Sequence, residues 1–463
     1  MTSTIAVLDV GKTNVKLLVF HDEVAVWRRS APNIVKPAPP YPHEDTEAIW
    51  RFCMASLREA AQNHMIDAIV VTTHGASVVL ADDRDLAAPV MDYEFAGPDE
   101  LEAEYASVRP DFAETLTPAM PDGLNWARQV FFVERRCPDL FARTKHILMY
   151  PQYWAWRLTG VARNEITSLG CHGDAWNPKT GMPSSLVERL GWTRFLPPLT
   201  SAWNVLGPLR AEIATETGLG TGTPVLAGMH DSNASLIPYL LSLDTPFTVV
   251  STGTWVVIVG VGAPVDRVVE GSGTMANVDV LGRPGPVARF MGGREFAILT
   301  EGFVQEGDES DLAAVLESGV MAVPSFAPHA SPVRTQGRIR GELPDKPGAR
   351  AALASLYEAL FTDLQLSLLG TDRGPIVVEG PFTANSLFCG ILAALRAPQS
   401  VLVDTETTGA AYGTSLLAQW PEKPTHNTLR AAVPCAHAAA VIQHKTLWRA
   451  RVDEYPASSH EKR

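Results

Sequence analysis

The sequence contains the same strand–turn–strand pattern twice, about half a chain apart, and this repeat constrains the fold more than any other feature. In the first copy, the apolar run 4–10 is followed by a polar turn, 11–14, and a second apolar run, 15–20. In the second copy, the run 247–251 precedes the turn Thr252-Gly253-Thr254 and the run 255–261. Short β-branched runs around such turns are typical of β-hairpins. The repeat predicts two domains, each beginning with a hairpin.

The rest of the chain alternates predicted strands with predicted helices. Apolar residues recur at helical spacing in 46–62, 125–136, 150–158, 351–369 and 385–395, whereas 68–72 and 376–379 are short apolar runs. This alternation predicts an α/β protein. Because 463 residues exceed what one hydrophobic core usually holds, we place a boundary near residue 243. The predicted domains are 1–243 and 244–463.

Composition excludes several classes of function. The formal net charge is −13, from 38 basic and 51 acidic residues, which disfavours a nucleic-acid or anionic membrane surface. No apolar run approaches the roughly 20 residues that span a bilayer. The five cysteines are scattered without CxxC spacing, so we expect reduced thiols, a cytoplasmic location and no structural zinc. His172, His437 and His444 lack partners at metal-ligand spacing and are interpreted as incidental.

The first turn has the chemistry of a phosphate site. Asp9 ends a predicted buried strand, and the turn Gly11-Lys12-Thr13-Asn14 follows. A glycine lets the backbone approach an anion closely, and N–H and hydroxyl groups can hold phosphate oxygens. A carboxylate beside that anion can hold Mg²⁺. An ordinary hairpin with a charged tip explains the same residues equally well.

Asp231 is the best candidate for a general base. It follows a glycine and a predicted strand, 225–227, and phosphoryl transfer to an alcohol requires acceptance of the hydroxyl proton. It also precedes a short helical segment, where Asp is a favoured N-cap. The turn at 252–254 could hold phosphate, and Gly380 and Asn385 could lie against a flat ring, although both segments also suit ordinary connections. No P-loop or protein-kinase motif occurs.

Taken together, these segments resemble the FGGY carbohydrate kinases, in the same order and at similar spacing. The resemblance rests on IAVLDVGKTNVKLLVF, PQYWAWRLTG, AGMHDSNAS, STGTW, VVEGPFTANSLF and TGAAYGTSLLA. The His-Asp-Ser triplet and STGTW look closest to the rhamnulokinases and fuculokinases, which act on 6-deoxyketohexoses. The resemblance implies an actin-like, ribonuclease H-like fold of two domains with a cleft between them. It also implies ATP and Mg²⁺ as cofactors, and a homodimer is compatible with it.

The resemblance implies a role for each candidate residue. Asp231 would accept the proton, and Asp9 would hold the metal. The sugar would be contacted by His74, Gly75, His230 and Ser232. ATP would be contacted by Gly11, Lys12, Thr13, Asn14, Gly253, Thr254, Gly380 and Asn385. The substrate would be a ketose, such as a 6-deoxyketohexose or a ketopentose, or a polyol.

Several positions depart from the family pattern. Lys12 replaces a hydroxyl residue, Gln152 stands where many relatives have Asp, Arg289 where rhamnulokinases have Asn, and Gly390 where Gln is frequent. The segment 73–77 resembles xylulokinases more than rhamnulokinases. These departures motivate a second hypothesis, a sugar or nucleotide sensor on the same fold. An actin-like ATPase or chaperone module is a third, which the His-Asp-Ser triplet disfavours.

Overall fold

The structure is a computed structural model that describes residues 3–302, 306–327, 333, 335–405, 409–425 and 428–453. The chain divides into two compact units. The first unit contains Met1–Leu243, Ala276–Pro284 and Thr408–His426. The second contains Asp244–Met275, Gly285–Thr407 and Asn427–Arg463. Two late segments of the chain therefore belong to the first unit.

The first unit is built on a sheet with the strand order β11-β12-β6-β1-β2-β3, and β13 also pairs with β6. The hairpin predicted at 4–20 is confirmed as β1 (Thr4–Val10) antiparallel to β2 (Asn14–His21). β6 (Ala68–Thr73) runs parallel to β1 on its other side. All residues of β1 are buried, as expected for a central strand with neighbours on both edges.

Helices cover this sheet because each presents an apolar face. α1 (Thr46–Ala61) begins where the Asp45 carboxylate accepts the Ala48 N–H, a typical N-cap. α6 (Tyr150–Thr159) ends at Gly160, whose φ of +83° suits a helix C-terminus. Trp154 and Trp156 of α6 are buried in the hydrophobic core of the first unit. α16 (Gly409–Leu416) packs on β1 and β6 although it lies far along the chain.

The remaining elements of the first unit are mostly short. They are β3 (Val24–Pro32), β4 (Val35–Lys36), β5 (His43–Glu44), β7 (Val78–Ala81), η1 (Gly97–Leu101), α2 (Glu102–Ala106), α3 (Phe112–Thr115), α4 (Trp126–Arg136), α5 (Pro138–Phe141), β8 (His146–Met149), α7 (Ile166–Leu169), β9 (Trp176–Asn177), β10 (Met182–Pro183), α8 (Ser185–Arg189), η2 (Trp192–Phe195), β11 (Val205–Pro208), α9 (Ala211–Thr217), β12 (Pro224–Leu226), β13 (Met229–His230), α10 (Asp231–Ala234), α11 (Ile237–Ser242) and η5 (Leu417–Gln419). β3 is a nine-residue strand that pairs antiparallel with β2.

The second unit repeats this plan with a sheet that contains the order β17-β15-β14-β20-β21-β22. The second predicted hairpin is confirmed as β14 (Phe247–Thr252) antiparallel to β15 (Val256–Val261). β20 (Ile376–Glu379) runs parallel to β14, as β6 does to β1. The two units therefore share a hairpin whose first strand also pairs with a parallel neighbour.

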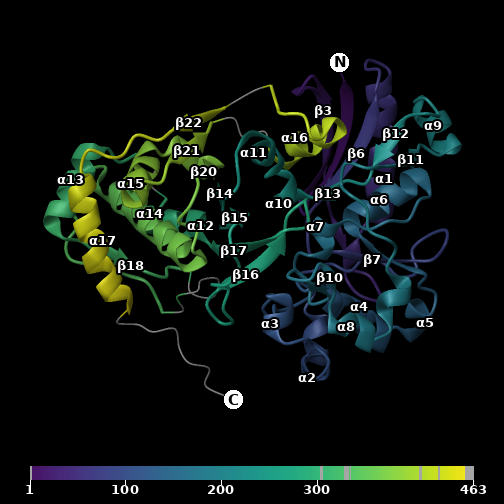
Figure 1. The fold of residues 1–463 in the computed structure, drawn as a ribbon, viewed down its shortest axis with the longest axis horizontal. Coiled ribbons are helices and arrows are strands. Elements are labelled where there is room, and N and C mark those ends of the chain that lie inside the picture. Colours follow the sequence, from purple (N-terminus) through teal and green to yellow (C-terminus); the bar gives the residue numbers. More distant parts are fainter. Residues whose placement is uncertain are drawn as a thin grey trace. The chain divides into compact units, whose positions relative to one another are not determined.

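A long apolar helix dominates the core of the second unit. α14 (Ala349–Leu369) is buried along most of its length and packs against α15 (Ser386–Arg396), which packs in turn against α17 (Ala438–Asp453) (Figure 1). The other elements of this unit are β17 (Pro284–Phe290), α12 (Gly292–Thr300), α13 (Glu309–Ser318), β18 (Met321–Val323), β19 (Arg338–Arg340), η4 (Pro381–Ala384), β21 (Val401–Asp404) and β22 (Leu429–Ala431). β16 (Thr274–Val278) spans the point where the chain passes from one unit to the other.

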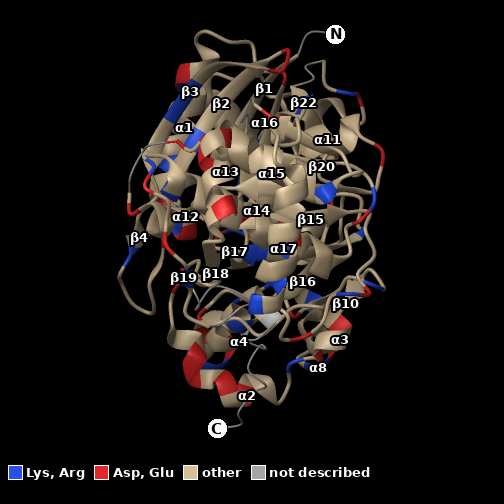
Figure 2. Cartoon of the chain, turned by 90° about the vertical axis from the view of Figure 1, so that its left-hand side faces the viewer, with Lys and Arg blue, Asp and Glu red and all other residues tan. Residues whose placement is uncertain are grey.

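Charged residues are spread over many elements of the structure. Figure 2 shows acidic residues on α2 and a mixture of acidic and basic residues elsewhere in that view. Among the described residues, no helix combines the length and the apolar character that crossing a bilayer requires.

Candidate active site

Three parallel strands of the first unit end at one edge of the sheet, and each end carries a predicted site residue. β1 ends with Asp9 and Val10, and Asp9 pairs in register with Thr72 of β6. His230 of β13 pairs with Thr73, also on β6. Because the carboxyl ends of parallel strands meet at the same edge, Asp9, His74 and Asp231 are brought together there. This is the position at which α/β sheets usually bind ligands.

Asp231 occupies the first turn of α10. Its Oδ1 accepts the Ser232 N–H at 2.6 Å and lies 3.3 Å from Nε2 of His230. The side chain of Asp231 is 30% exposed, so the carboxylate remains open to a ligand. The alternative interpretation of Asp231 as the N-cap is wrong, since His230 holds that position and makes no side-chain capping bond. The Asp231 carboxylate therefore contacts its neighbours through Oδ1 and remains partly accessible.

The electrostatics of this edge follow from two neighbouring carboxylates in partly dry surroundings. Asp9 is buried, and burial raises the pKa of Asp9, with the charge of Asp231 acting in the same direction. Lys16, whose Nζ lies 3.3 Å from Oδ2 of Asp9, opposes that rise. Burial lowers the pKa of His230, which favours a neutral imidazole near pH 7. A cation beside Asp9 would therefore favour the charged form of this buried carboxylate.

Two glycines are required by close approach at this edge. A Cβ on Gly75 would lie 2.4 Å from Nε2 of His230, so only glycine lets the His230 ring occupy its place. Gly228 has a φ of +72°, and a Cβ there would lie 2.0 Å from the carbonyl oxygen of Val71. Gly228 thus allows the chain to cross closely over β6 just before Asp231.

Three buried polar residues outside the predicted site hold this segment in place. Nε2 of Gln152 donates to the carbonyl oxygens of Ala227 and Gly228 at 3.1 and 3.0 Å. The Thr167 hydroxyl donates to Glu165 at 2.6 Å and accepts the His230 N–H at 3.1 Å. Burial raises the pKa of Glu165 to about 8. The sequence marked Gln152 only as a departure from the family pattern and did not mark Glu165 or Thr167. The partners of Gln152 and Thr167 in this segment lie about 60 to 75 positions away.

The first turn is tightly closed, but Lys12 turns toward other residues of the first unit. The Gly11 N–H donates to the Asn14 carbonyl oxygen at 3.0 Å, and Thr13 and Asn14 are exposed. Nζ of Lys12 forms ion pairs with Asp92 and with Glu44, and it lies 4.7 Å from the centroid of Tyr93. Lys12 therefore already has two carboxylate partners, and its predicted contact with a phosphate stays a prediction.

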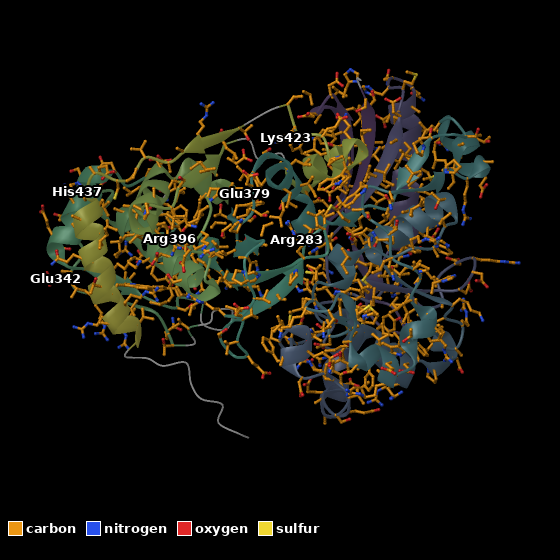
Figure 3. The ribbon with its side chains drawn as sticks, in the orientation of Figure 1. Arg283, Glu342, Glu379, Arg396, Lys423 and His437 are labelled. Atoms are coloured by element: carbon orange, nitrogen blue, oxygen red, sulfur yellow. The ribbon has the colours of Figure 1, made fainter. Side chains whose placement is uncertain are left out.

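The predicted nucleotide residues of the second unit lie at the matching edge of its sheet. β14 and β20 are parallel, with Ser251 opposite Glu379, so Gly253 and Gly380 follow neighbouring strand ends. The Thr252 hydroxyl donates to the Glu379 carbonyl oxygen at 2.6 Å and accepts the Phe382 N–H at 3.0 Å. Figure 3 labels Glu379 at this strand end. This hydroxyl ties the two strand ends together.

Gly380 and Asn385 have defined local roles in this arrangement. Gly380 has a φ of +85°, and a Cβ there would lie 2.0 Å from the Thr252 carbonyl oxygen. The Asn385 side chain accepts the Phe388 N–H at 2.9 Å and donates to the Ser355 hydroxyl at 2.9 Å. Asn385 is therefore the N-cap of α15, and its predicted contact with the nucleotide stays a prediction.

The structure explains two further departures from the family pattern. The Arg289 guanidinium lies 5.5 Å from the centroid of Trp255, directly after the second turn. A Cβ on Gly390 would lie 3.2 Å from the Val433 carbonyl oxygen, so a larger residue there would push this segment away from α15. Both residues are thus fixed by packing within the second unit.

His172, which sequence spacing left without metal-ligand partners, lies near two such residues in the structure. Ligand atoms of Cys171, His172 and His230 all lie within 4.8 Å of one another, close enough that they could hold a metal ion. The sequence could not show this, since 58 positions separate His172 from His230.

Comparison with known proteins identifies the family. Residues 4–238 match the N-terminal domain of the FGGY family of carbohydrate kinases, and residues 244–428 match the C-terminal domain of carbohydrate kinase FGGY. The structure is similar to that of a carbohydrate kinase from Novosphingobium aromaticivorans, with a TM-score of 0.90 and 35% identity over 98% of this chain and 99% of that one. It also has the fold of xylulose kinase from Rhodospirillum rubrum, with a TM-score of 0.78 at 20% identity over 97% and 98% of the two chains.

Curated relatives match over shorter stretches. The chain is 24% identical to L-xylulose/3-keto-L-gulonate kinase of Escherichia coli over 49% of this chain and 47% of that protein. It is 25% identical to L-fuculokinase of Salmonella typhi over 57% of each. The matched region thus spans about half the length of these relatives. Since both domains of the family match in order and the fold is the actin-like α/β fold of its members, this chain belongs to the FGGY family of carbohydrate kinases.

Proposed function

We propose that this protein transfers the terminal phosphoryl group of ATP to a hydroxyl of a small sugar, with Asp231 as the general base. The substrate is a ketose, such as a 6-deoxyketohexose or a ketopentose, or a polyol. The observation that carries the proposal is the Asp231 carboxylate, which is 30% exposed at the edge where three strands end. Family membership supports the reaction class, and the fuculokinase and xylulose kinase relatives support this range of sugars.

Each residue of the first unit has a distinct task in this proposal. Asp231 accepts the proton of the attacking hydroxyl as the bond to phosphorus forms, so no free alkoxide is needed. The neutral His230 ring, the Ser232 hydroxyl and His74 offer hydrogen bonds to the other hydroxyls of the sugar. Gly75 keeps space for the ring of His230, because any side chain there would displace it. Discrimination between sugars then depends on these fixed polar groups.

The nucleotide is assigned mainly to backbone and hydroxyl groups. The turn 11–14 lies in the predicted sugar-binding domain, 1–243, whereas Gly253, Thr254 and Gly380 lie in the predicted nucleotide domain, 244–463. Free N–H groups in such turns suit phosphate oxygens. Asn385 and Lys12 complete the predicted set. Transfer then requires the terminal phosphate to come into line with the hydroxyl beside Asp231.

Asp9 fits the metal ion that such a reaction uses. Its carboxylate is buried and lies near the charge of Asp231; burial is the main cause of the raised pKa of Asp9, and the charge of Asp231 acts in the same direction. Carboxylate oxygen is a ligand that Mg²⁺ prefers. When bound, Mg²⁺ neutralises charge on the phosphates of ATP. Asp9 would hold the ion directly or through water.

A substrate screen tests the proposal. The purified protein is assayed for ADP release with ATP and Mg²⁺ against ketopentoses, 6-deoxyketohexoses and polyols, and each sugar is also tested for a shift in thermal stability. We expect turnover with at least one sugar, which must also raise the melting temperature. Stabilisation by a sugar without ADP release from any of them would instead identify a sensor and overturn the proposal.

A further inference from the structure

A second cluster of reactive side chains lies beside the proposed base and shares only His230 with the proposed reaction. Ligand atoms of Cys171, His172 and His230 lie within 4.8 Å of one another in the first unit. Cys171 and His230 are buried, whereas His172 is partly exposed. One thiol and two imidazoles form a soft donor set that suits Zn²⁺ far better than Mg²⁺.

The backbone holds these three side chains together without a metal ion. The Thr167 hydroxyl accepts the His230 N–H at 3.1 Å, which anchors β13 to the helix that precedes Cys171. The His172 carbonyl oxygen accepts the Trp126 N–H at 2.9 Å. His172 has a φ of +51°, so Cys171 and His172 do not alternate between opposite faces as in a strand. Two segments far apart in sequence are thereby fixed next to each other.

The spacing is compatible with a metal ion after small side-chain rotations. Zn–S and Zn–N bonds of about 2.3 and 2.0–2.1 Å at tetrahedral angles place ligand atoms about 3.3–3.6 Å apart. The ligand atoms now lie within 4.8 Å of one another, at most about 1.5 Å farther apart than in a bound site. Three protein ligands would leave the fourth position to water, as in open zinc sites.

We propose that Cys171, His172 and His230 form a binding site for Zn²⁺, and that the bound ion inhibits the enzyme. The inhibitory part rests on the proposed function. Nε2 of His230 lies 3.3 Å from Oδ1 of Asp231, and Nδ1 lies 3.3 Å from Nδ2 of Asn233. A metal ion on either nitrogen replaces one of these contacts. Because the proposed function assigns the His230 ring to the sugar, the bound ion would compete with the sugar for this side chain.

Spectroscopy of the full chain tests the site independently of activity. Co²⁺ replaces Zn²⁺ as the probe, because a Co²⁺–thiolate bond gives a near-ultraviolet charge-transfer band and tetrahedral Co²⁺ gives strong visible bands. We expect one Co²⁺ per chain with both features, and loss of both when Zn²⁺ is added. Binding without the thiolate band would overturn the proposal.

Substitutions identify the ligands. Cys171→Ser should abolish the thiolate band and weaken Zn²⁺ binding by at least about 100-fold, more than loss of an outer hydrogen bond usually costs. His172→Asn should also weaken binding, and Asn tolerates the left-handed backbone at this position. Cys137→Ser is the control, since it removes a thiol of the same unit outside the cluster and should change nothing. Wild-type affinity in Cys171→Ser would refute the assignment.

Activity separates the two proposals. If the protein turns over a sugar, Zn²⁺ should inhibit wild type and Cys137→Ser at concentrations that leave Cys171→Ser active. Equal inhibition of all three would overturn the inhibitory role. A protein without turnover that still gives one Co²⁺–thiolate complex would count against the kinase and support the metal site.

Discussion

The two units present the same strand geometry but carry different kinds of chemical group at the strand ends. In the first unit, the strand ends carry side chains that can exchange protons or bind cations, namely Asp9, His74, His230 and Asp231. In the second, the equivalent edge carries Thr252, Gly253, Thr254 and Gly380, which offer hydroxyl and backbone groups. The same hairpin with a parallel neighbour supports both arrangements.

This difference teaches how each half should respond to mutation. In the first unit, where charged side chains are assigned the chemistry, removing one functional group should change the reaction and leave the fold intact. In the second unit, where backbone groups are assigned to the nucleotide, adding one methyl group should be the damaging change, because the new carbon blocks close approach to the backbone. Four substitutions test this contrast, and they follow in order of expected effect.

Asp231→Asn should have the largest effect. The amide cannot accept the hydroxyl proton, so we expect kcat to fall by about 10²–10⁴-fold while ATP binding and folding are kept. Steady-state kinetics and calorimetric titration with ATP measure the two properties. Asp83→Asn is the control, since Asp83 is an exposed carboxylate of the same unit. Near-normal turnover in Asp231→Asn would refute the assignment of the base.

Glu165→Gln should change how the stability of the first unit depends on pH. Burial raises the pKa of Glu165 to about 8 from 4.5, so the native state holds a proton that the unfolded state releases. The stability that the protonated Glu165 contributes to the native state is fully present below pH 4.5 and is lost as pH rises through 8. The uncharged Gln should therefore be more stable than wild type at pH 9 by a few kcal/mol. Denaturant unfolding at pH 6 and pH 9 measures the free energy of unfolding of wild type and Glu165→Gln. An equal loss in both proteins between the two pH values would contradict the prediction.

Gly380→Ala should damage the second unit by adding one carbon. The new Cβ would lie 2.0 Å from the Thr252 carbonyl oxygen, at a φ of +85°. We expect the free energy of unfolding to fall by about 1–3 kcal/mol, as for other strained backbone positions. Affinity for ATP should fall with it, and sugar-induced stabilisation should remain. Unchanged stability would contradict the strain argument.

Gly253→Ala should have the smallest effect. It tests directly whether the backbone of the second unit binds the nucleotide. The nearest atom to its added Cβ is the Trp255 carbonyl oxygen at 3.7 Å, an ordinary contact, so the fold should tolerate it. If phosphate approaches this backbone, ATP affinity should still fall by about tenfold, which is about 1.4 kcal/mol. Wild-type affinity with wild-type stability would remove Gly253 from the nucleotide site.

Local patterns predicted most of the secondary structure. Both hairpins and the helices near 46–62, 150–158 and 351–369 are confirmed within a few residues. These elements are apolar runs or strongly periodic segments, in which burial and propensity agree. The short elements between residues 78 and 208 carry no such pattern, and their conformation depends on partners elsewhere in the chain. α16 likewise belongs to the first unit because it packs on β1 and β6, which are distant from it in sequence.

The sequence by itself determined the family and the residues that can carry chemistry, because motif spacing and side-chain type are local properties. It named Asp9, Asp231 and the two glycine-containing turns without any coordinates. Only the tertiary structure decided which contacts hold them in place. Gln152 donates to the segment before Asp231, and Thr167, itself bonded to Glu165, accepts the His230 N–H. Lys12 forms ion pairs with carboxylates of the first unit. The tertiary structure also brought His172 to His230. Such contacts join residues distant in sequence, and packing alone selects them.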